Sequence, residues 1–236
     1  MSGRGRQLVL DLPHRQALGR DDFLVTKSNA AAVALIDHWP DWPAHAAIIV
    51  GPPGSGKSHL MEVWRQRSNA SRVRAADINL EAAPELLMSG SVAIEDAASP
   101  LNERGLFHLL NLARQQNSSL LLTARTRPEH WKIALPDLLS RLRAIPVLEI
   151  LPPDDALLRG VLVKLFFDRQ IAADESTISF MLTRMPRSLG AARLLVAEID
   201  RRALEERAEV TRPFVAKVLA DFSAPELSPE LFGDED

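Results

Sequence analysis

The stretch AAIIVGPPGSGKSHL, residues 46–60, decides the fold class of this 236-residue chain. Five apolar residues end at Gly51, as expected of a buried parallel strand, and the residues after Ser58 resume helical periodicity. Between them, GPPGSGKS matches the P-loop pattern G-x-x-x-x-G-K-[ST] in the strand–loop–helix context that this motif requires. A glycine-rich turn that only joins a strand to a helix is the alternative, and the complete spacing disfavours it.

The residue types in this loop suit phosphate binding. Its glycines allow the backbone to fold into a nest of N–H groups at the N-terminus of a helix. Lys57 can neutralise a β-phosphate, and the hydroxyl of Ser58 can ligate Mg²⁺. We therefore expect ADP or ATP, with Mg²⁺, as cofactors. The expected nucleotide-binding residues are Gly51, Pro52, Pro53, Gly54, Ser55, Gly56, Lys57, Ser58 and His59.

Outward from the loop, the chain alternates between strand and helix patterns. Apolar runs predict strands at 46–51, 71–76, 91–96, 119–125 and 146–151, and helical patterns lie at 26–40, 59–69 and 101–117. This alternation is typical of an α/β fold with a parallel sheet. After residue 151 the strands stop, and four segments with capping Asp, Ser or Thr predict helices at 154–170, 174–185, 188–208 and 211–222.

Four regions follow from this pattern. Residues 1–20 form an N-terminal peptide and tether, 21–151 an α/β base domain, 152–222 an all-helical domain, and 223–236 an acidic tail. The first helical pattern begins with Ser28 or Asn29 as its expected cap.

Composition limits the possible functions. The chain has no cysteine, which agrees with a cytoplasmic location and excludes thiolate metal sites. Its net charge of −3 gives no overall attraction to nucleic acid, and its apolar runs are too short to cross a membrane. The six histidines lack the spacing of a metal site. We expect no direct sequence-specific DNA binding and no membrane association.

A second acidic motif complements the P-loop. In VAIEDA, residues 92–97, apolar residues deliver Glu95 and Asp96 to the carboxyl end of a strand, where Mg²⁺ and an attacking water would be held. Glu95 is the expected metal ligand together with Ser58, and both acidic residues are candidates for catalysis. Because P-loop enzymes usually place Asp at the first position, Glu95 predicts weak hydrolysis by this chain. An ordinary acidic exit from a strand is the alternative.

These motifs, with LLLTARTRP, LPDLLSRL and RSLGAARLL after them, resemble the AAA+ module of the replication initiator DnaA over residues 20–222. The chain also resembles the shorter Hda type, the DnaA homologues that inactivate the initiator. It ends in an acidic tail without a basic recognition helix, which argues against origin binding. The implied fold is an AAA+ P-loop core followed by a helical lid.

The resemblance gives the N-terminal peptide a partner. QLVLDLP, residues 7–13, is similar to the Hda segment that binds the sliding clamp, the beta subunit of DNA polymerase III. An extended peptide can place alternate side chains in a groove. Pattern alone favours an edge strand packed on its own domain, whereas the module behind it favours the clamp. The expected clamp-binding residues are Gln7, Leu8, Leu10 and Leu12.

Arginines carry the implied activity. In the family, an arginine after an L-x-S-R-like turn completes a neighbour's ATP site, and LLSRL places Arg141 there, with Arg143 as the fallback. In RSLGAA, Arg187 matches the sensor 2 arginine, which reaches the phosphates. Each could instead be an ordinary surface arginine on a helix. Arg125 stands where the initiator has an acidic residue, so no catalytic role is assigned to the sensor 1 site.

The expected function is that of a nucleotide-binding regulator. It would bind the clamp and stimulate hydrolysis of DnaA-bound ATP through Arg141, which prevents re-initiation. DnaA and the clamp are the expected partners, and homo-oligomers are possible. Two alternatives stay open: a self-sufficient ATPase of the initiator or helicase-loader type, and a clamp-binding nucleotide sensor that contributes no finger.

Overall fold

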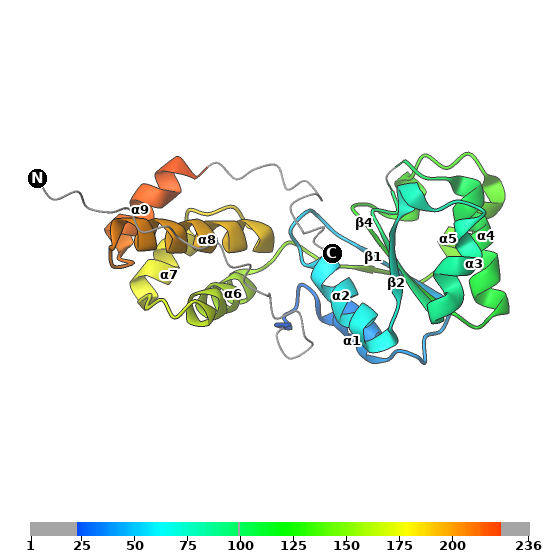
Figure 1. Ribbon diagram of the computed structural model, residues 1–236, viewed down its shortest axis with the longest axis horizontal. Coiled ribbons are helices and arrows are strands. Elements are labelled where there is room, and N and C mark those ends of the chain that lie inside the picture. The colour runs from blue at the N-terminus through cyan, green and yellow to red at the C-terminus, as the bar shows by residue number, and fades with distance from the viewer. Residues whose placement is uncertain (1–22, 99, 223–236) are drawn as a thin grey trace, which may run out of the picture. The chain divides into compact units, whose positions relative to one another are not determined.

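The computed structural model describes residues 23–98 and 100–222 (Figure 1). These residues belong to two compact units that meet in sequence between Pro152 and Pro153. The first unit contains the P-loop, and the second is entirely helical where the structure describes it.

The first unit is built on a parallel five-stranded sheet of order β2-β3-β4-β1-β5. All four strand pairs are parallel, which confirms the predicted α/β fold class. Residues of β1 are buried throughout, because both faces of the sheet are covered by helices. The strands are β1 Ala46–Val50, β2 Ser71–Arg74, β3 Ser91–Glu95, β4 Ser119–Ala124 and β5 Val147–Glu149.

Helices pack on both faces of this sheet (Figure 1). Alternate residues of β1 enter the two cores: Ala47 and Ile49 pack with α1 and α2, and Ile48 and Val50 pack with α3, α4 and α5. Short 3₁₀ turns lie at Ala75–Asp77, Leu87–Ser89 and Pro128–His130. The helices are α1 Ala30–Asp37, α2 Lys57–Ser68, α3 Ala82–Leu86, α4 Glu103–Gln115 and α5 Pro136–Ala144.

The start of α1 differs from the sequence prediction. Asn29 occupies the N-cap position but makes no side-chain capping bond. Its side chain turns back instead: Oδ1 accepts from the N–H of Thr26 at 2.9 Å, and Nδ2 donates to the carbonyl of Leu24 at 2.9 Å. The hydroxyl of Ser28 lies 2.8 Å from that of Thr26. These side chains brace the preceding turn rather than the helix.

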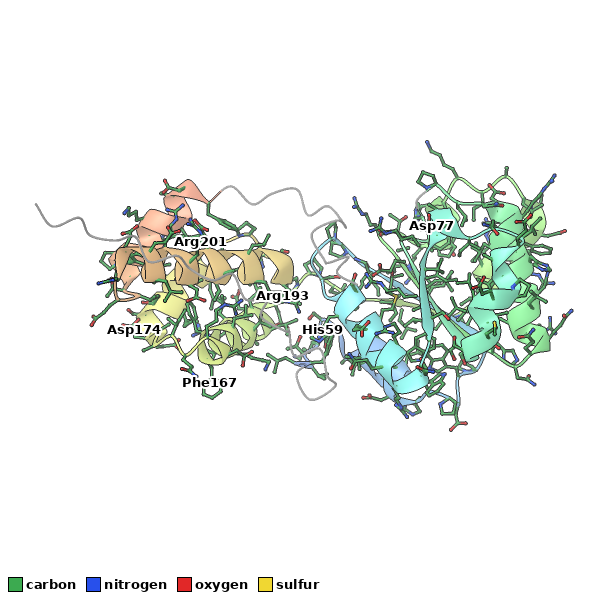
Figure 2. The ribbon with its side chains drawn as sticks, viewed as in Figure 1. His59, Asp77, Phe167, Asp174, Arg193 and Arg201 are labelled. Carbon is green, nitrogen blue, oxygen red and sulfur yellow. The ribbon has the colours of Figure 1, made fainter. Side chains whose placement is uncertain are left out.

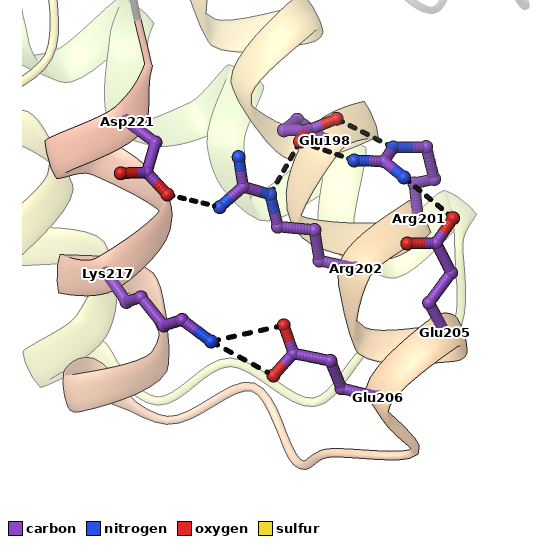
Figure 3. Close-up of polar contacts among 7 residues, drawn as sticks. All are labelled: Glu198, Arg201, Arg202, Glu205, Glu206, Lys217 and Asp221. Atoms are coloured by element: carbon purple, nitrogen blue, oxygen red, sulfur yellow. Dashed lines mark hydrogen bonds and ion pairs between the residues drawn. The ribbon is translucent and has the colours of Figure 1, made fainter.

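The second unit contains α6 Asp155–Asp168, α7 Glu175–Leu182, α8 Leu189–Glu206 and α9 Arg212–Asp221. Asp154, Asp174 and Ser188 cap the first three of these by accepting from backbone N–H groups, as predicted. Thr211 precedes α9 without a side-chain bond. Ion pairs join α9 to α8 (Figure 3). No helix in the described ranges has the length and apolarity needed to span a bilayer.

Candidate functional site: a P-loop at the carboxyl edge of the sheet

Three strands end together at the P-loop. Val50 pairs with Ala124, and the N–H of Gly51 donates to the carbonyl of Ala124 at 3.2 Å. The N–H of Ala97, just after β3, donates to the carbonyl of Thr123 at 2.8 Å. The carboxyl edge of β1, β4 and β3 therefore brings the loop, the acidic motif and the residues after β4 to one place.

The glycines of the loop are required by its geometry. A Cβ at position 51 would lie 2.4 Å from the carbonyl oxygen of Ile150 and 3.0 Å from Oγ of Ser55, so only glycine fits without a shift. Gly54 and Gly56 have φ of +70° and +103°, a region that L side chains avoid. The loop thus turns its backbone tightly into α2.

The loop has the features of an anion cradle. Oγ of Ser55 is buried and has no hydrogen-bond partner within the described part of the chain. The hydroxyl of Ser58, by contrast, lies on an exposed residue in the first turn of α2. Helix α2 begins directly after Gly56 with no side-chain cap, which leaves its first N–H groups to an outside acceptor. These residues fit a nucleotide phosphate chain.

Lys57 lies across the loop. Its Nζ donates to the carbonyls of Gly51 and Pro52 at 2.8 and 2.9 Å. Burial lowers the pKa of Lys57 to about 8, while the charge of Asp96 opposes this shift and that of Arg125 adds to it. The cost of burying the Lys57 ammonium is therefore only partly offset by the charge of Asp96, and the ammonium is held against the P-loop backbone.

The acidic motif does not offer Glu95 to a metal. Oε2 of Glu95 accepts from Nε and Nη2 of Arg72 on β2 at 3.1 and 2.8 Å. Ser58 suits Mg²⁺, but the predicted second ligand is committed to a guanidinium. The pair Ser58 and Glu95 therefore does not fit a magnesium site as these residues stand.

Asp96, unlike Glu95, has an electrostatic effect on the lysine of the P-loop. It is the carboxylate whose charge raises the pKa of Lys57 against the effect of burial. Its φ is +50°, an unusual conformation for a non-glycine residue and one that concentrates at functional sites. Asp96 is the better placed of the two acidic candidates.

His59 lies on α2 one residue after Ser58 (Figure 2). Its ring meets the ring of Phe23 edge-on, with centroids 5.0 Å apart. Phe23 belongs to the core on this face of the sheet. The contact fixes the segment before α1 next to the P-loop helix.

The predicted finger lies on a helix, not after a turn. Arg141 is in α5, half-buried, with its guanidinium carbon 5.1 Å from the ring centroid of Phe107. Arg143, two residues on, is exposed. Pro136 at the start of α5 and Leu138 and Leu142 one turn apart are the sequence signals that indicate this helix.

Arg187 is bound within the helical unit. Its Nη1 donates to Oδ1 of Asp155 at 2.6 Å, and Nη2 donates to the carbonyl of Pro153 at 3.3 Å. Gln7, Leu8, Leu10 and Leu12 lie outside the described residues. No group of three or more His, Cys, Asp or Glu residues able to hold a metal occurs in the ranges that the structure describes.

Two residues of this neighbourhood were not identified as site residues from sequence. Arg72 has no motif around it, and its pairing with Glu95 depends on the β2–β3 register. Arg125 was noted only as a departure at sensor 1. Its position directly after Ala124, the partner of Val50, is the signal that places it beside the loop.

Comparison with known proteins supports the fold. No protein-family model matches the chain. An uncharacterised protein of Haemophilus influenzae is 26% identical over 184 residues, which cover 72% of this chain and 80% of that protein. Domain III of the replication initiation protein DnaA of Thermotoga maritima superposes with a TM-score of 0.75 at 16% identity, covering 91% of this chain and 100% of that one.

Two further structures give the same result. AMPPCP-bound DnaA of Aquifex aeolicus matches with a TM-score of 0.65 at 15% identity, covering 79% of this chain and 68% of that one. A RuvB variant of Thermotoga maritima matches with a TM-score of 0.67 at 18% identity, covering 87% of this chain and 73% of that one. The chain therefore has the fold of the AAA+ ATPases: a P-loop core with a parallel sheet, followed by a helical region.

Proposed function

We propose that this chain is a nucleotide-binding AAA+ regulator of replication initiation, which stimulates hydrolysis of DnaA-bound ATP while tethered to the sliding clamp. The observation that carries nucleotide binding is the P-loop cradle: Gly51 packed against Ile150, a buried Ser55 hydroxyl with no hydrogen-bond partner among the described residues, and an α2 whose first turn has no side-chain cap. ADP or ATP would bind with its phosphates at these groups.

The reaction on this proposal takes place on the partner's ATP. An arginine that enters a neighbour's site stabilises the charge of the transferring phosphoryl group and is typically worth about 10³ to 10⁵ in rate. Arg141 and Arg143 are the candidates, both near the C-terminus of α5. Arg141 is partly covered by Phe107 and Arg143 is exposed, so each is tested separately.

The proposed location comes from the N-terminal peptide. Gln7, Leu8, Leu10 and Leu12 alternate as an extended peptide in a groove requires, with leucines for apolar pockets. A clamp loaded on DNA would hold the module where replication is under way. The fold similarity to DnaA domain III supports an AAA+ pairing between the two proteins.

The test measures hydrolysis of radiolabelled ATP pre-bound to DnaA, with the full chain and with clamp loaded on DNA. Wild type should accelerate hydrolysis only when the clamp is present. Arg141→Ala or Arg143→Ala should abolish the acceleration if that arginine is the finger, and Leu8→Ala with Leu12→Ala should remove the clamp dependence. Arg104→Ala, on the exposed surface of α4, is the matched arginine control.

If both α5 variants accelerate hydrolysis as wild type does, the trans finger is wrong. If the leucine variant keeps full clamp-dependent activity, clamp binding through residues 7–12 is wrong. An acceleration that needs the clamp but no arginine would favour the adaptor alternative.

One observation favours a second candidate, a self-sufficient ATPase. Asp96 acts electrostatically on Lys57 and directly follows β3 at the carboxyl edge of the sheet, beside the loop. Such a residue can activate water. Turnover of ATP by this chain alone, lost in both Asp96→Asn and Lys57→Ala, would support this candidate, and absence of turnover in wild type would exclude it.

A further inference from the structure

The two acidic residues of the candidate site are each matched to a cation of the protein. Glu95, whose side chain is 13% exposed, accepts two bonds from Arg72 on the neighbouring strand. Asp96 is matched electrostatically to the Lys57 ammonium. A metal ion that used Glu95 would compete with Arg72 for this carboxylate, and one that used Asp96 would meet the positive charge of Lys57, so both residues are poor Mg²⁺ ligands as they stand.

Arg125 supplies a positive charge near the loop. It follows Ala124, whose carbonyl accepts from the N–H of Gly51 at 3.2 Å, so its backbone begins beside the first residue of the loop. Its side chain is exposed and, within residues 23–98 and 100–222, makes no hydrogen bond or ion pair. The electrostatic effect of Arg125 on Lys57 agrees with this proximity. A guanidinium so placed can reach an anion bound in the loop.

We infer that this site binds nucleoside phosphates without Mg²⁺, because Arg125, in addition to the P-loop lysine Lys57, supplies the positive charge that a metal ion supplies in other P-loop sites. The inference rests on the proposed nucleotide binding. It makes Arg125 a phosphate-binding residue, and it makes Arg72 a positioning residue that withholds Glu95 from a metal. Guanidinium groups suit this role, since their planar donors bind phosphate oxygens in pairs.

The experiment is a calorimetric titration of the full chain with ADP, in MgCl₂ and in EDTA. Wild type should show dissociation constants that differ by less than about threefold between the two. Arg125→Ala should weaken binding in EDTA by about tenfold or more, through loss of a charge-assisted hydrogen bond. Arg127→Ala is the matched control, because this arginine lies on the same loop but pairs with Glu149. The Arg127→Ala variant should bind ADP with the affinity of wild type.

A second variant tests Arg72. Arg72→Met keeps an unbranched side chain on β2 and releases Glu95, so ADP should now bind more tightly in MgCl₂ than in EDTA. Far-UV circular dichroism and thermal unfolding check that each variant is folded. The Arg125→Ala comparison stands without the Arg72 variant. The exposed side chain of Arg125 makes no hydrogen bond or ion pair with the described residues, so its removal should not destabilise the fold.

The failures can be told apart. If wild type binds ADP in MgCl₂ and loses it in EDTA, metal-independent binding is wrong while nucleotide binding stands. If Arg125→Ala binds as tightly as Arg127→Ala in EDTA, the role of Arg125 is wrong. If wild type binds ADP in neither solution but is folded, the proposed nucleotide-binding function itself fails.

Discussion

Burial of the charged Lys57 side chain lowers the stability of the folded chain by an amount that depends on pH. Burial lowers its pKa to about 8, so between about 8 and the ordinary lysine value of 10.5 the folded chain binds fewer protons than the unfolded chain. The free energy of unfolding is therefore reduced by the full amount below pH 8, and it recovers as the pH rises from 8 to 10.5. Phosphates bound in the loop should raise this pKa again, because they stabilise the ammonium.

We therefore predict proton uptake when ADP binds near pH 8, of up to about half a proton per nucleotide. Calorimetry in two buffers with different ionisation enthalpies measures this number directly. Lys57→Arg is the control, since arginine is already charged at this pH and should bind ADP without uptake. Uptake of the same size in the arginine variant would show that another group titrates.

Position 51 requires glycine because there is no room for a side chain, and not because of its backbone φ angle. The Cβ of an alanine would meet the carbonyl oxygen of Ile150 at 2.4 Å, so β5 or the loop would have to move. We expect Gly51→Ala to cost about 1–3 kcal/mol in stability and to abolish ADP binding. Denaturant unfolding and ADP titration measure the two effects.

Gly90→Ala separates stability from binding. Gly90 has φ of +82° with open space around it, so alanine there is strained but meets no neighbour. It should lower stability by about 1 kcal/mol and leave ADP binding intact. Wild-type ADP affinity in Gly51→Ala would refute the cradle geometry.

Helix α9 is held to α8 by an ionic network (Figure 3). Glu198 accepts from Arg201 and Arg202, and Arg202 reaches Asp221 on α9 at 2.7 Å. Hydrogen bonds from Arg201, and then from Arg202, lower the pKa of Glu198 to about 2. Its stabilising contribution is present above the unfolded value of 4.5 and is lost as the pH falls toward 2.

We predict that Glu198→Gln weakens the attachment of α9 to α8 before it affects the rest of the helical unit. Hydrogen exchange of α9 amides should quicken at pH 7, while at pH 2 the variant and wild type should exchange alike. Because these groups face solvent, the stability cost should stay below about 1 kcal/mol and shrink in high salt. Glu205→Gln is the control, since Glu205 contacts Arg201 of its own helix. Equal effects of both variants on α9 would disprove the coupling.

The elements could be read from sequence wherever one pattern dominated. All five strands were predicted, because buried parallel strands appear as short continuous apolar runs that end in turn residues. Helix α3 was missed, since five residues containing Pro84 carry no periodicity. Helix α5 was also not predicted, because its segment was interpreted as a turn. Asn29 was predicted as a cap and serves the preceding turn, because an asparagine side chain can satisfy either set of backbone groups.

The site was only half predictable for a related reason. The P-loop is a local motif, so its position on β1 and α2 follows from residues 46–60 alone. The commitment of Glu95 to Arg72 depends on which strand lies beside β3 and in which register. Sequence spacing contains neither piece of information, so the acidic motif appeared to be a ready metal ligand.

The helical unit offers a test of whether the whole chain responds to nucleotide. ADP at a hundred times its dissociation constant should raise the free energy of unfolding of the unit that binds it by about 2.7 kcal/mol. If Arg187 acts as a sensor arginine, it must exchange Asp155 for a phosphate, and Arg187→Ala should weaken ADP binding by about tenfold or more. Arg184→Ala, on the same unit with its guanidinium over Phe180, is the control.

Scanning calorimetry with and without ADP then distinguishes two outcomes. With wild type, we expect the transition of the P-loop unit to shift upward, because that unit contains the phosphate cradle. If Arg187 takes part in binding, the transition of the helical unit should also shift, and Arg187→Ala should remove that second shift. A wild-type response in which only the P-loop unit shifts would show that Arg187 stays with Asp155, and that nucleotide is sensed by residues 23–152 alone.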